Sequence, residues 1–246
     1  MRLKLCFNCE TGVTLPFNYN DALVAAVNSA LQKSGLSRAR NQSQHMYTFS
    51  QLYFSAYNIC ESGITNSGDC VEWFLSSPRI YFLEHLLKGF QQLGAVSVGP
   101  VDLYLHDVEV LADPEFTEQM EFSCMSPITV VTRPGLQQVK ARYGRINDTG
   151  FTDALRRDLV QKYYLIYDSL PTGDDLRITF NKRYIANKKR VSRLIDFQGQ
   201  RIFGYMVPFV VEGNPELIKV GYQVGFGSNN HYGFGMVKVW HRINGQ

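Results

Sequence analysis

A glycine-rich stretch near the C-terminal end, GFGSNNHYGFG (225–235), constrains the fold of this chain more than any other feature. Glycine adopts positive φ angles without steric cost, so two Gly-x-Gly units around a polar centre favour a loop over regular structure. The spacing matches neither the dinucleotide-binding pattern nor a Walker loop, which ends in Gly-Lys-Ser or Gly-Lys-Thr. Two interpretations stay open: a loop shaped for close contact with a phosphate ligand, and a glycine-rich turn between two strands.

The 246 residues give room for one large domain or two small ones, and we favour two. Apolar residues make up 45% and charged residues 19% of the chain, which are values typical of a globular protein. No apolar run is long enough to span a bilayer, and the N-terminus lacks the apolar stretch and cleavage site of a secretory signal. We therefore expect a cytoplasmic protein without a membrane partner.

The five cysteines form an odd set, in which only Cys6 and Cys9 have the spacing of metal ligands. They lie in a segment expected to be a strand, where residues three apart face opposite sides of the sheet. Simple packing is therefore a better interpretation than a metal or redox site. We expect neither a bound metal nor a cofactor.

The net charge of +3 hides an uneven distribution. Residues 89–132 contain no lysine or arginine, whereas residues 177–193 contain no acid. The basic residues of this second segment, called the basic block below, are Arg177, Lys182, Arg183, Lys188, Lys189, Arg190 and Arg193. Cations interleaved with Phe180 and Tyr184 suit the phosphates and unstacked bases of a nucleic acid. A solvated basic hairpin is the alternative, but the segregation of the acids favours a nucleic acid.

Hydrophobic periodicity divides the first half into strands and helices. The expected elements are a strand at 2–8, a helix up to about residue 34, a hairpin of strands at 46–57 and 71–75 with its turn at 63–68, a helix at 79–93 and a strand at 101–111. The order β-α-β-β-α-β is that of a ferredoxin-like domain, which we place at residues 1–118.

The second half predicts the same order in a looser form. The expected elements are a strand at 127–132, a helix at 148–169, two long strands at 175–185 and 200–211 that flank a basic hairpin turn, a short helix at 215–222 and a closing strand at 236–240. The glycine-rich stretch then joins a helix to the last strand. We place this domain at residues 119–246, so the predicted fold class is α+β, with two tandem ferredoxin-like (RRM-like) domains.

Two ferredoxin-like domains that end in two Gly-Phe-Gly units, five residues apart, resemble the RAMP superfamily of CRISPR-associated RNA-binding proteins. More narrowly, the chain is similar to the sixth Cas family, the endoribonucleases that cut CRISPR precursor transcripts within the repeat. The residues that carry this resemblance are PFNYN (16–20), YTFS (47–50), SPI (126–128) and VGYQVGFG (220–227). The resemblance covers nearly the whole chain. It implies CRISPR repeat RNA as partner, and it leaves open a homodimer or a CRISPR effector complex.

The resemblance implies a metal-independent reaction, in which the ribose 2′-hydroxyl attacks the adjacent phosphate and leaves a 2′,3′-cyclic phosphate and a 5′-hydroxyl. The reaction needs a base, an acid and a cation, and histidine suits the first two roles because its pKa lies near working pH. The family's catalytic histidine usually follows the first helix. Residues 36–44 hold no histidine, so we expect His45 to be the general acid or base. Arg38 or Arg40 is the expected phosphate clamp, and Lys33 is a weaker candidate.

The resemblance also implies that the glycine-rich stretch contacts RNA. The residues expected to take part, besides the basic block, are Gly225, Gly227, Ser228, Asn229, Asn230, His231, Gly233 and Gly235. Asn28 stands on the first helix where the family often has a tyrosine. A second function therefore stays open, that of a non-catalytic RNA-binding RAMP protein or a subunit of a CRISPR interference complex. A ferredoxin-like enzyme with a metabolite pocket is a third, which the basic block disfavours.

Overall fold

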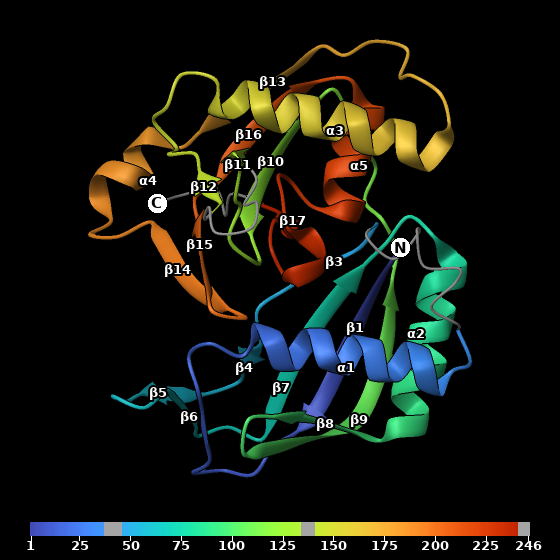
Figure 1. Ribbon diagram of the computed structural model, residues 1–246, viewed down its shortest axis with the longest axis vertical. Coiled ribbons are helices and arrows are strands. Elements are labelled where there is room, and N and C mark those ends of the chain that lie inside the picture. Colours follow the sequence, from blue (N-terminus) through green and yellow to red (C-terminus); the bar gives the residue numbers. More distant parts are fainter. Residues whose placement is uncertain (37–45, 134–140, 241–246) are drawn as a thin grey trace.

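The computed structural model describes residues 1–36, 46–133 and 141–240, and its architecture is mixed α+β. Two main antiparallel sheets, each with its own helices, form two halves that lie one above the other in Figure 1. The lower half in that view contains the chain up to the end of strand β9 (Val101–Leu111), and the upper half contains the rest. Within the described ranges, none of the helices combines the length and apolar character needed to cross a bilayer.

The N-terminal half is built on a sheet with the strand order β3-β7-β1-β9-β8, in which β4 also pairs with β7. Its other elements are β1 (Arg2–Asn8), α1 (Asn20–Lys33), β3 (Thr48–Phe49), β4 (Tyr53–Phe54), β7 (Cys70–Ser76), α2 (Ile80–Leu93) and β8 (Ala95–Val98). Strand β1 alternates as the sequence predicts, because Leu3, Leu5 and Phe7 are buried in one core with residues of both helices. A separate small sheet consists of β2 (Thr14–Leu15), β6 (Ile64–Asn66) and β5 (Tyr57–Ile59).

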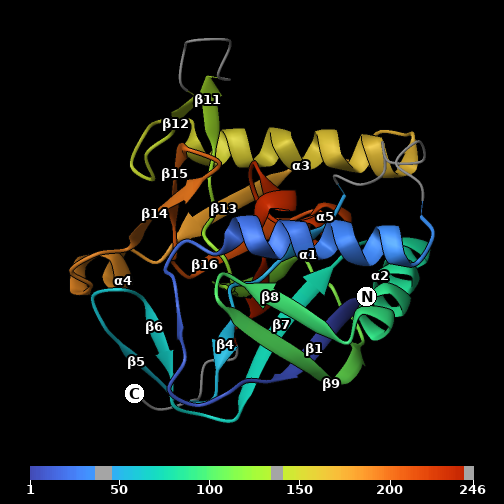
Figure 2. The ribbon, with the colours of Figure 1, turned by 60° about the horizontal axis from the view of Figure 1, so that its bottom comes forward.

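The C-terminal half is built on a sheet with the strand order β13-β16-β10-β17. The sheet and its helices consist of β10 (Gln119–Cys124), α3 (Phe151–Tyr167), β13 (Leu176–Phe180), β16 (Phe209–Gly213), α5 (Pro215–Val224) and β17 (Val237–Val239). The inserted elements are β11 (Val131–Arg133), β12 (Arg142–Tyr143), α4 (Lys182–Asn187), β14 (Ser192–Phe197) and β15 (Gln200–Tyr205). Figure 2 shows the β14–β15 hairpin beside the paired strands β11 and β12.

The two main sheets share one strand order when strands are counted along each half. When the short strand β4 and the edge strand β8 are left out of the count, each sheet runs second, third, first, fourth from one edge. One helix follows the first strand of each half, and another follows the third. The succession of strands and helices expected for both halves is therefore present.

The first strand of the second sheet lies at 119–124, so the prediction of a strand at 127–132 was wrong. Strand β10 contributes only Met120 and Phe122 to the core. Polar and apolar residues alternate from Gln119 to Cys124, which is itself a strand signal, but the longer apolar run at 127–132 gives a stronger one. The apolar run at 127–132 lies instead beside the glycine-rich stretch, to which Thr129 forms an isolated bridge.

The two long strands expected around the basic block are also wrong, because each is divided. Strand β13 ends where Asn181 caps helix α4, since its Oδ1 accepts a hydrogen bond from the backbone N–H of Tyr184 at 2.8 Å. The segment 200–211 splits into β15 and β16, which belong to different sheets. Pro208 lies between them, and proline has no N–H to donate to a sheet.

A buried arginine joins the two halves. Arg2 of β1 donates from Nη2 to the carbonyl oxygen of Tyr222 on α5 at 2.7 Å, and its guanidinium carbon lies 3.4 Å from the centre of the Tyr222 ring. Burial lowers the pKa of Arg2 to about 10. Nearby, Asp113 forms an ion pair with the amino group of Met1 at 2.6 Å and accepts a hydrogen bond from Gln223 at 2.5 Å. Charged and polar groups thus contribute directly to the interface between the halves.

Candidate nucleic-acid interface

The glycine-rich stretch, called the glycine loop below (residues 225–235), leads from the end of α5 towards β17 and is mostly buried. Its four glycines and the rings of Phe226 and Phe234 are shielded from solvent. Ser228 and His231 keep partial exposure. The loop therefore belongs to the interior along most of its length, and its polar centre reaches the surface.

All four glycines of the loop have positive φ angles, between 77° and 98°, which glycine adopts far more readily than other residues. Close contacts inside the protein add a second requirement. A Cβ atom at Gly227 would overlap the carbonyl oxygen of Thr129, and one at Gly233 would overlap the ring of Phe49. At these positions, the close approach that glycine permits is an approach to the protein's own groups.

A buried lysine of α3 fixes the start of the glycine loop. The Nζ atom of Lys162 donates to the carbonyl oxygens of Gly225 and Gly227 at 2.8 and 2.7 Å. The carboxylate of Asp158, one helical turn earlier, forms an ion pair with the same amine at 2.5 Å. Burial lowers the pKa of Lys162, and Asp158 opposes this shift. Sequence reasoning missed this pair because an acid and a base four residues apart usually form a solvated pair on a helix surface.

Three of the short motifs that carry the family resemblance meet at the glycine loop. Asn20 of PFNYN donates from Nδ2 to a carbonyl oxygen of the loop at 2.8 Å. Thr48 of YTFS donates from Oγ1 to the carbonyl oxygen of Phe234 at 2.9 Å. Ser126 of SPI accepts at Oγ a hydrogen bond from the N–H of Met236, next to the loop, at 2.9 Å. Motifs far apart in the sequence thus support one loop, which contacts both halves.

Ser228 lies where the glycine loop borders a cavity of about 260 Å³. Its backbone N–H donates to the carbonyl oxygen of Thr129 at 2.7 Å, and its Oγ accepts a hydrogen bond from the N–H of Val131 at 3.1 Å. Arg157 of α3 is exposed and lines the same cavity. A fixed hydroxyl beside an exposed guanidinium is suited to an anionic ligand.

The other polar residues at the centre of the loop differ in burial. Asn230 is buried, and its Nδ2 donates to the carbonyl oxygen of Phe234 at 3.0 Å. Asn229 and His231 are partly exposed. Asn230 therefore supports the loop from inside, whereas Ser228, Asn229 and His231 form its exposed edge.

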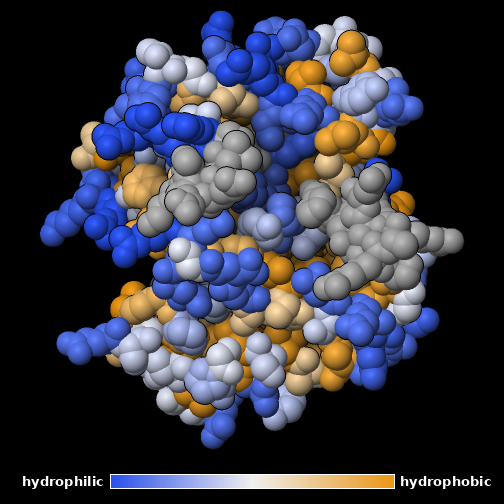
Figure 3. Space-filling model, in the orientation of Figure 1, coloured by the Kyte–Doolittle hydropathy of each residue, from blue (hydrophilic) through white to orange (hydrophobic). Residues whose placement is uncertain are grey.

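The basic block spreads over several elements and does not form the single hairpin turn that the sequence predicts. Arg177 lies on β13, Lys182 and Arg183 on α4, Lys188, Lys189 and Arg190 between α4 and β14, and Arg193 on β14. All seven side chains are exposed, and none forms an ion pair with another described residue. Figure 3 shows hydrophilic side chains gathered at the left of the upper half, where α4 lies in Figure 1. The block is thus a surface of excess positive charge.

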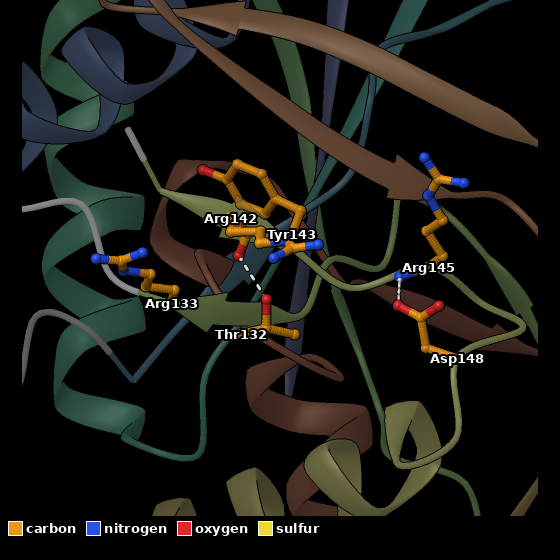
Figure 4. A pocket seen from close by; sticks show the side chains of 6 residues that line it. All are labelled: Thr132, Arg133, Arg142, Tyr143, Arg145 and Asp148. Atoms are coloured by element: carbon orange, nitrogen blue, oxygen red, sulfur yellow. Dashed lines mark hydrogen bonds between the residues drawn. The ribbon is translucent and has the colours of Figure 1, made fainter. Parts of the chain in front are cut away.

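A second group of cations, which sequence reasoning did not single out, lines a groove of about 900 Å³ beside β11 and β12. We call it the arginine groove; its lining residues, drawn in Figure 4, are Thr132, Arg133, Arg142, Tyr143, Arg145 and Asp148. The antiparallel pairing of β11 and β12 brings Arg133 and Arg142 opposite each other. The sequence does contain a signal for this group, since arginines stand on both sides of the Pro134-Gly135 dipeptide, which is typical of a turn. The spacing of these residues alone does not give the register of a hairpin.

Lys33 is the expected catalytic residue that falls in the described part of the chain. It lies in the last turn of α1, and its side chain is exposed. Arg38, Arg40 and His45 lie in the segment 37–45, outside the described residues. Lys33 therefore places a positive charge at the exposed end of α1, four residues before the segment 37–45 begins.

Cys6 and Cys9, the pair with metal-ligand spacing, lie at and just beyond the end of β1. Burial raises the pKa of both thiols, which disfavours the thiolate that binds metals. Among the residues that the structure describes, no three or more histidine, cysteine or acidic side chains are grouped so that they could hold a metal ion.

The family model "CRISPR associated protein Cas6, C-terminal" matches residues 111–239, just over half of the chain. The chain belongs to the Cas6 family. The matched region contains the C-terminal sheet, the arginine groove, the basic block and the glycine loop. The Cas6 resemblance inferred from the sequence motifs is thereby confirmed.

Curated relatives extend over nearly the whole chain. A CRISPR-associated endoribonuclease Cas6 of Methanocaldococcus jannaschii is 25% identical over 243 residues, which cover 96% of this chain and 92% of that protein. A Cas6 protein of Pyrococcus furiosus described as endoribonuclease-like is 29% identical over 233 residues, which cover 92% of each chain.

Solved structures show the same architecture. A Cas6-related protein from Pyrococcus furiosus superposes with a TM-score of 0.84 at 25% identity, covering 98% of this chain and 99% of that one. A RAMP protein that binds different RNA substrates superposes with a TM-score of 0.85 at 24% identity, covering 98% of this chain and 100% of that one. At this identity, the second comparison shows a shared fold.

Proposed function

We propose that this Cas6-family protein is an endoribonuclease that cuts CRISPR precursor RNA within its repeats and so releases guide RNAs. One observation carries the proposal: the half that matches the family also exposes many cations without ion-pair partners among the described residues. Unpaired lysine and arginine side chains gain most from binding a phosphate backbone. The M. jannaschii relative is named an endoribonuclease, which supports the same activity here.

We infer that each half is a ferredoxin-like domain, with a boundary at residues 118 and 119. Each half contains the succession β-α-β-β-α-β and the same strand order. Residues 112–118 connect β9 to β10 and belong to neither a helix nor a strand, which supports a boundary at this point.

The proposed chemistry is attack of the ribose 2′-hydroxyl on the adjacent phosphate, without a metal ion. A base takes the 2′-hydroxyl proton, an acid protonates the leaving 5′-oxygen, and a cation stabilises the charge that develops on the phosphoryl oxygens. The products are a 2′,3′-cyclic phosphate and a 5′-hydroxyl. We assign the acid or base role to His45 and the cation role to Arg38 or Arg40, with Lys33 as a further cation. The exposed position of Lys33 at the end of α1 supports a substrate phosphate there.

The proposed RNA contacts are the basic block and the exposed edge of the glycine loop. Ser228, Asn229 and His231 have partly exposed side chains that suit hydrogen bonds to phosphate or base groups. The loop glycines and Asn230 contribute by holding this edge in place, as their burial supports.

The proposal is tested by cleavage of an end-labelled repeat RNA in excess EDTA. We expect cutting to persist, and a 2′-deoxy substitution at the scissile nucleotide to abolish cutting without loss of binding. His45→Ala should slow cutting by about 10²–10⁴-fold, whereas His106→Ala, on the exposed face of β9, should leave the rate unchanged.

Three outcomes count against parts of the proposal. Cutting that stops in EDTA and returns with magnesium contradicts metal independence. Cutting of the 2′-deoxy substrate contradicts attack by the 2′-hydroxyl. Binding of repeat RNA without any cutting makes the protein a non-catalytic RNA-binding RAMP protein instead.

A further inference from the structure

Arg133 and Arg142 stand directly opposite each other across the paired strands β11 and β12. Like charges directly opposite on neighbouring strands destabilise the pairing. Both side chains are exposed, and neither forms an ion pair with any described residue. Figure 4 shows the two guanidinium groups extending to opposite sides of the strand pair, which avoids this repulsion and leaves each group available to an anion of its own.

The arginine groove offers such an anion a positively charged surface. Arg145 adds a third exposed guanidinium, farther along the groove in Figure 4. Asp148 is the single acid of the lining, and its Oδ2 accepts a hydrogen bond from the backbone N–H of Arg145 at 2.7 Å. That bond closes a turn, so the carboxylate serves the backbone and leaves the guanidinium groups without a carboxylate partner.

The groove is also held in a fixed shape. The hydroxyl of Thr132 donates to the carbonyl oxygen of Arg142 at 3.1 Å, and the N–H of Gly144 donates to the carbonyl oxygen of Val130 at 2.8 Å. Ser228 of the glycine loop accepts a hydrogen bond from the N–H of β11 at 3.1 Å. The groove is thereby anchored to the exposed edge of the loop, and its cations need little reorganisation on binding.

We propose that the arginine groove is a subsite for the phosphodiester backbone of the RNA, with separate phosphates contacted by Arg133, Arg142 and Arg145. The inference rests on the proposed function, since it extends the RNA surface from the glycine loop onto β11 and β12. Arginine suits this role because its planar guanidinium binds phosphate oxygens in pairs. Contacts of this kind position the strand without reading its sequence.

The test is the salt dependence of RNA binding for Arg142→Gln, measured by fluorescence anisotropy with a labelled single-stranded repeat RNA and with a scrambled RNA of the same length. The matched control is Arg156→Gln, because Arg156 of α3 is already paired with Asp174. For Arg142→Gln we expect both RNAs to bind about fourfold more weakly near 0.15 M salt, with the salt slope reduced by roughly 0.7. The control should match the wild type.

The melting temperature is a second readout, and it separates an RNA contact of Arg142 from a purely structural role of that residue. Arg142 is exposed and forms no ion pair with any described residue, so the melting temperature of Arg142→Gln should stay close to that of the wild type. Weaker RNA binding by an equally stable protein supports the subsite. Weaker binding that merely follows a lower melting temperature overturns it.

The remaining outcomes separate this inference from the proposed function. Failure of the wild type to bind repeat RNA overturns both. Wild-type binding, with Arg142→Gln indistinguishable from Arg156→Gln, overturns the groove alone. The phosphate group of a mononucleotide such as AMP is the other source of the same anion. If AMP raises the melting temperature of the wild type but not of Arg142→Gln, while the RNA salt slope stays unchanged, the groove binds nucleotides and the RNA subsite is wrong.

Discussion

The glycine loop and the arginine groove are neighbours joined through Ser228, yet their polar groups are used in opposite ways. In the loop, the carbonyl oxygens of Gly225 and Gly227 accept hydrogen bonds from Lys162, and further bonds come from α1 and β3. In the groove, three arginines face solvent without an ion-pair partner among the described residues. Polar groups that are hydrogen-bonded within the protein indicate a supporting role. Charged side chains without ion-pair partners indicate a surface that binds a ligand. The most conspicuous sequence motif thus forms internal structure along most of its length, while the less conspicuous arginines carry the unpaired charge that we propose contacts RNA.

The largest effect that can test this contrast is expected at Lys162. Replacement by methionine leaves the half-buried Asp158 without its cation and two loop carbonyl oxygens without a donor. We expect Lys162→Met to lower the free energy of unfolding by about 3–5 kcal/mol, measured by urea denaturation. Lys219→Met, on the exposed face of α5, should change it by less than about 0.5 kcal/mol. A loss at Lys162 as small as that of the control would show that the lysine does not hold the loop.

A smaller loss of stability is expected at Gly233. Valine there would have to adopt a φ of 83° and would overlap the ring of Phe49, so we expect a loss of about 2–4 kcal/mol from backbone strain and overpacking together. The folded fraction should bind RNA normally. Gly173→Val is the control, because that glycine has no positive φ and no atom within 4 Å of a Cβ. If the two variants have equal melting temperatures, the loop is not packed as described.

Much of the fold could be predicted from the sequence, because local periodicity reports burial within one element. Helix α2, expected at 79–93, spans Ile80–Leu93, and strand β9 has the expected bounds. The predicted pairing of 46–57 with 71–75 is present as two short strands, β3 and β4, on β7, but the turn expected at 63–68 was wrong, because strand β6 lies there and pairs with β5. Strand β10 was missed although its residues alternate between polar and apolar, because the apolar run at 127–132 carries the stronger strand signal.

The site was less predictable, because its features depend on contacts between distant segments. The glycine signal gave the place and the conformation of the loop, but not its burial against Phe49 and Thr129. Helix α4 was missed because a run of cations resembles a solvated turn, and only the Asn181 cap marks its start. The pairing of Arg133 with Arg142 across β11 and β12 requires a strand register that charge spacing does not specify.

The basic block should show an effect on RNA binding without an effect on stability. Lys188 and Lys189 are exposed, so their replacement by glutamine should leave the melting temperature unchanged. We expect the double variant to bind repeat and scrambled RNA about tenfold more weakly near 0.15 M salt, with a salt slope reduced by roughly 0.7 for each lost contact. Titrations of both RNAs at several salt concentrations measure this. An unchanged slope would mean that these lysines are only solvated.

The contrast between scaffold and RNA contact is tested most directly by measuring melting temperature and RNA dissociation constant on the same preparations of Gly233→Val and Arg142→Gln. We expect crossed results: Gly233→Val melts well below the wild type while its folded fraction binds RNA normally, and Arg142→Gln melts close to the wild type while binding RNA about fourfold more weakly near 0.15 M salt. A stable Gly233→Val that binds RNA poorly, beside an Arg142→Gln that binds RNA normally, would contradict the account. The glycines of the loop would then contact RNA themselves, and the arginine groove would not.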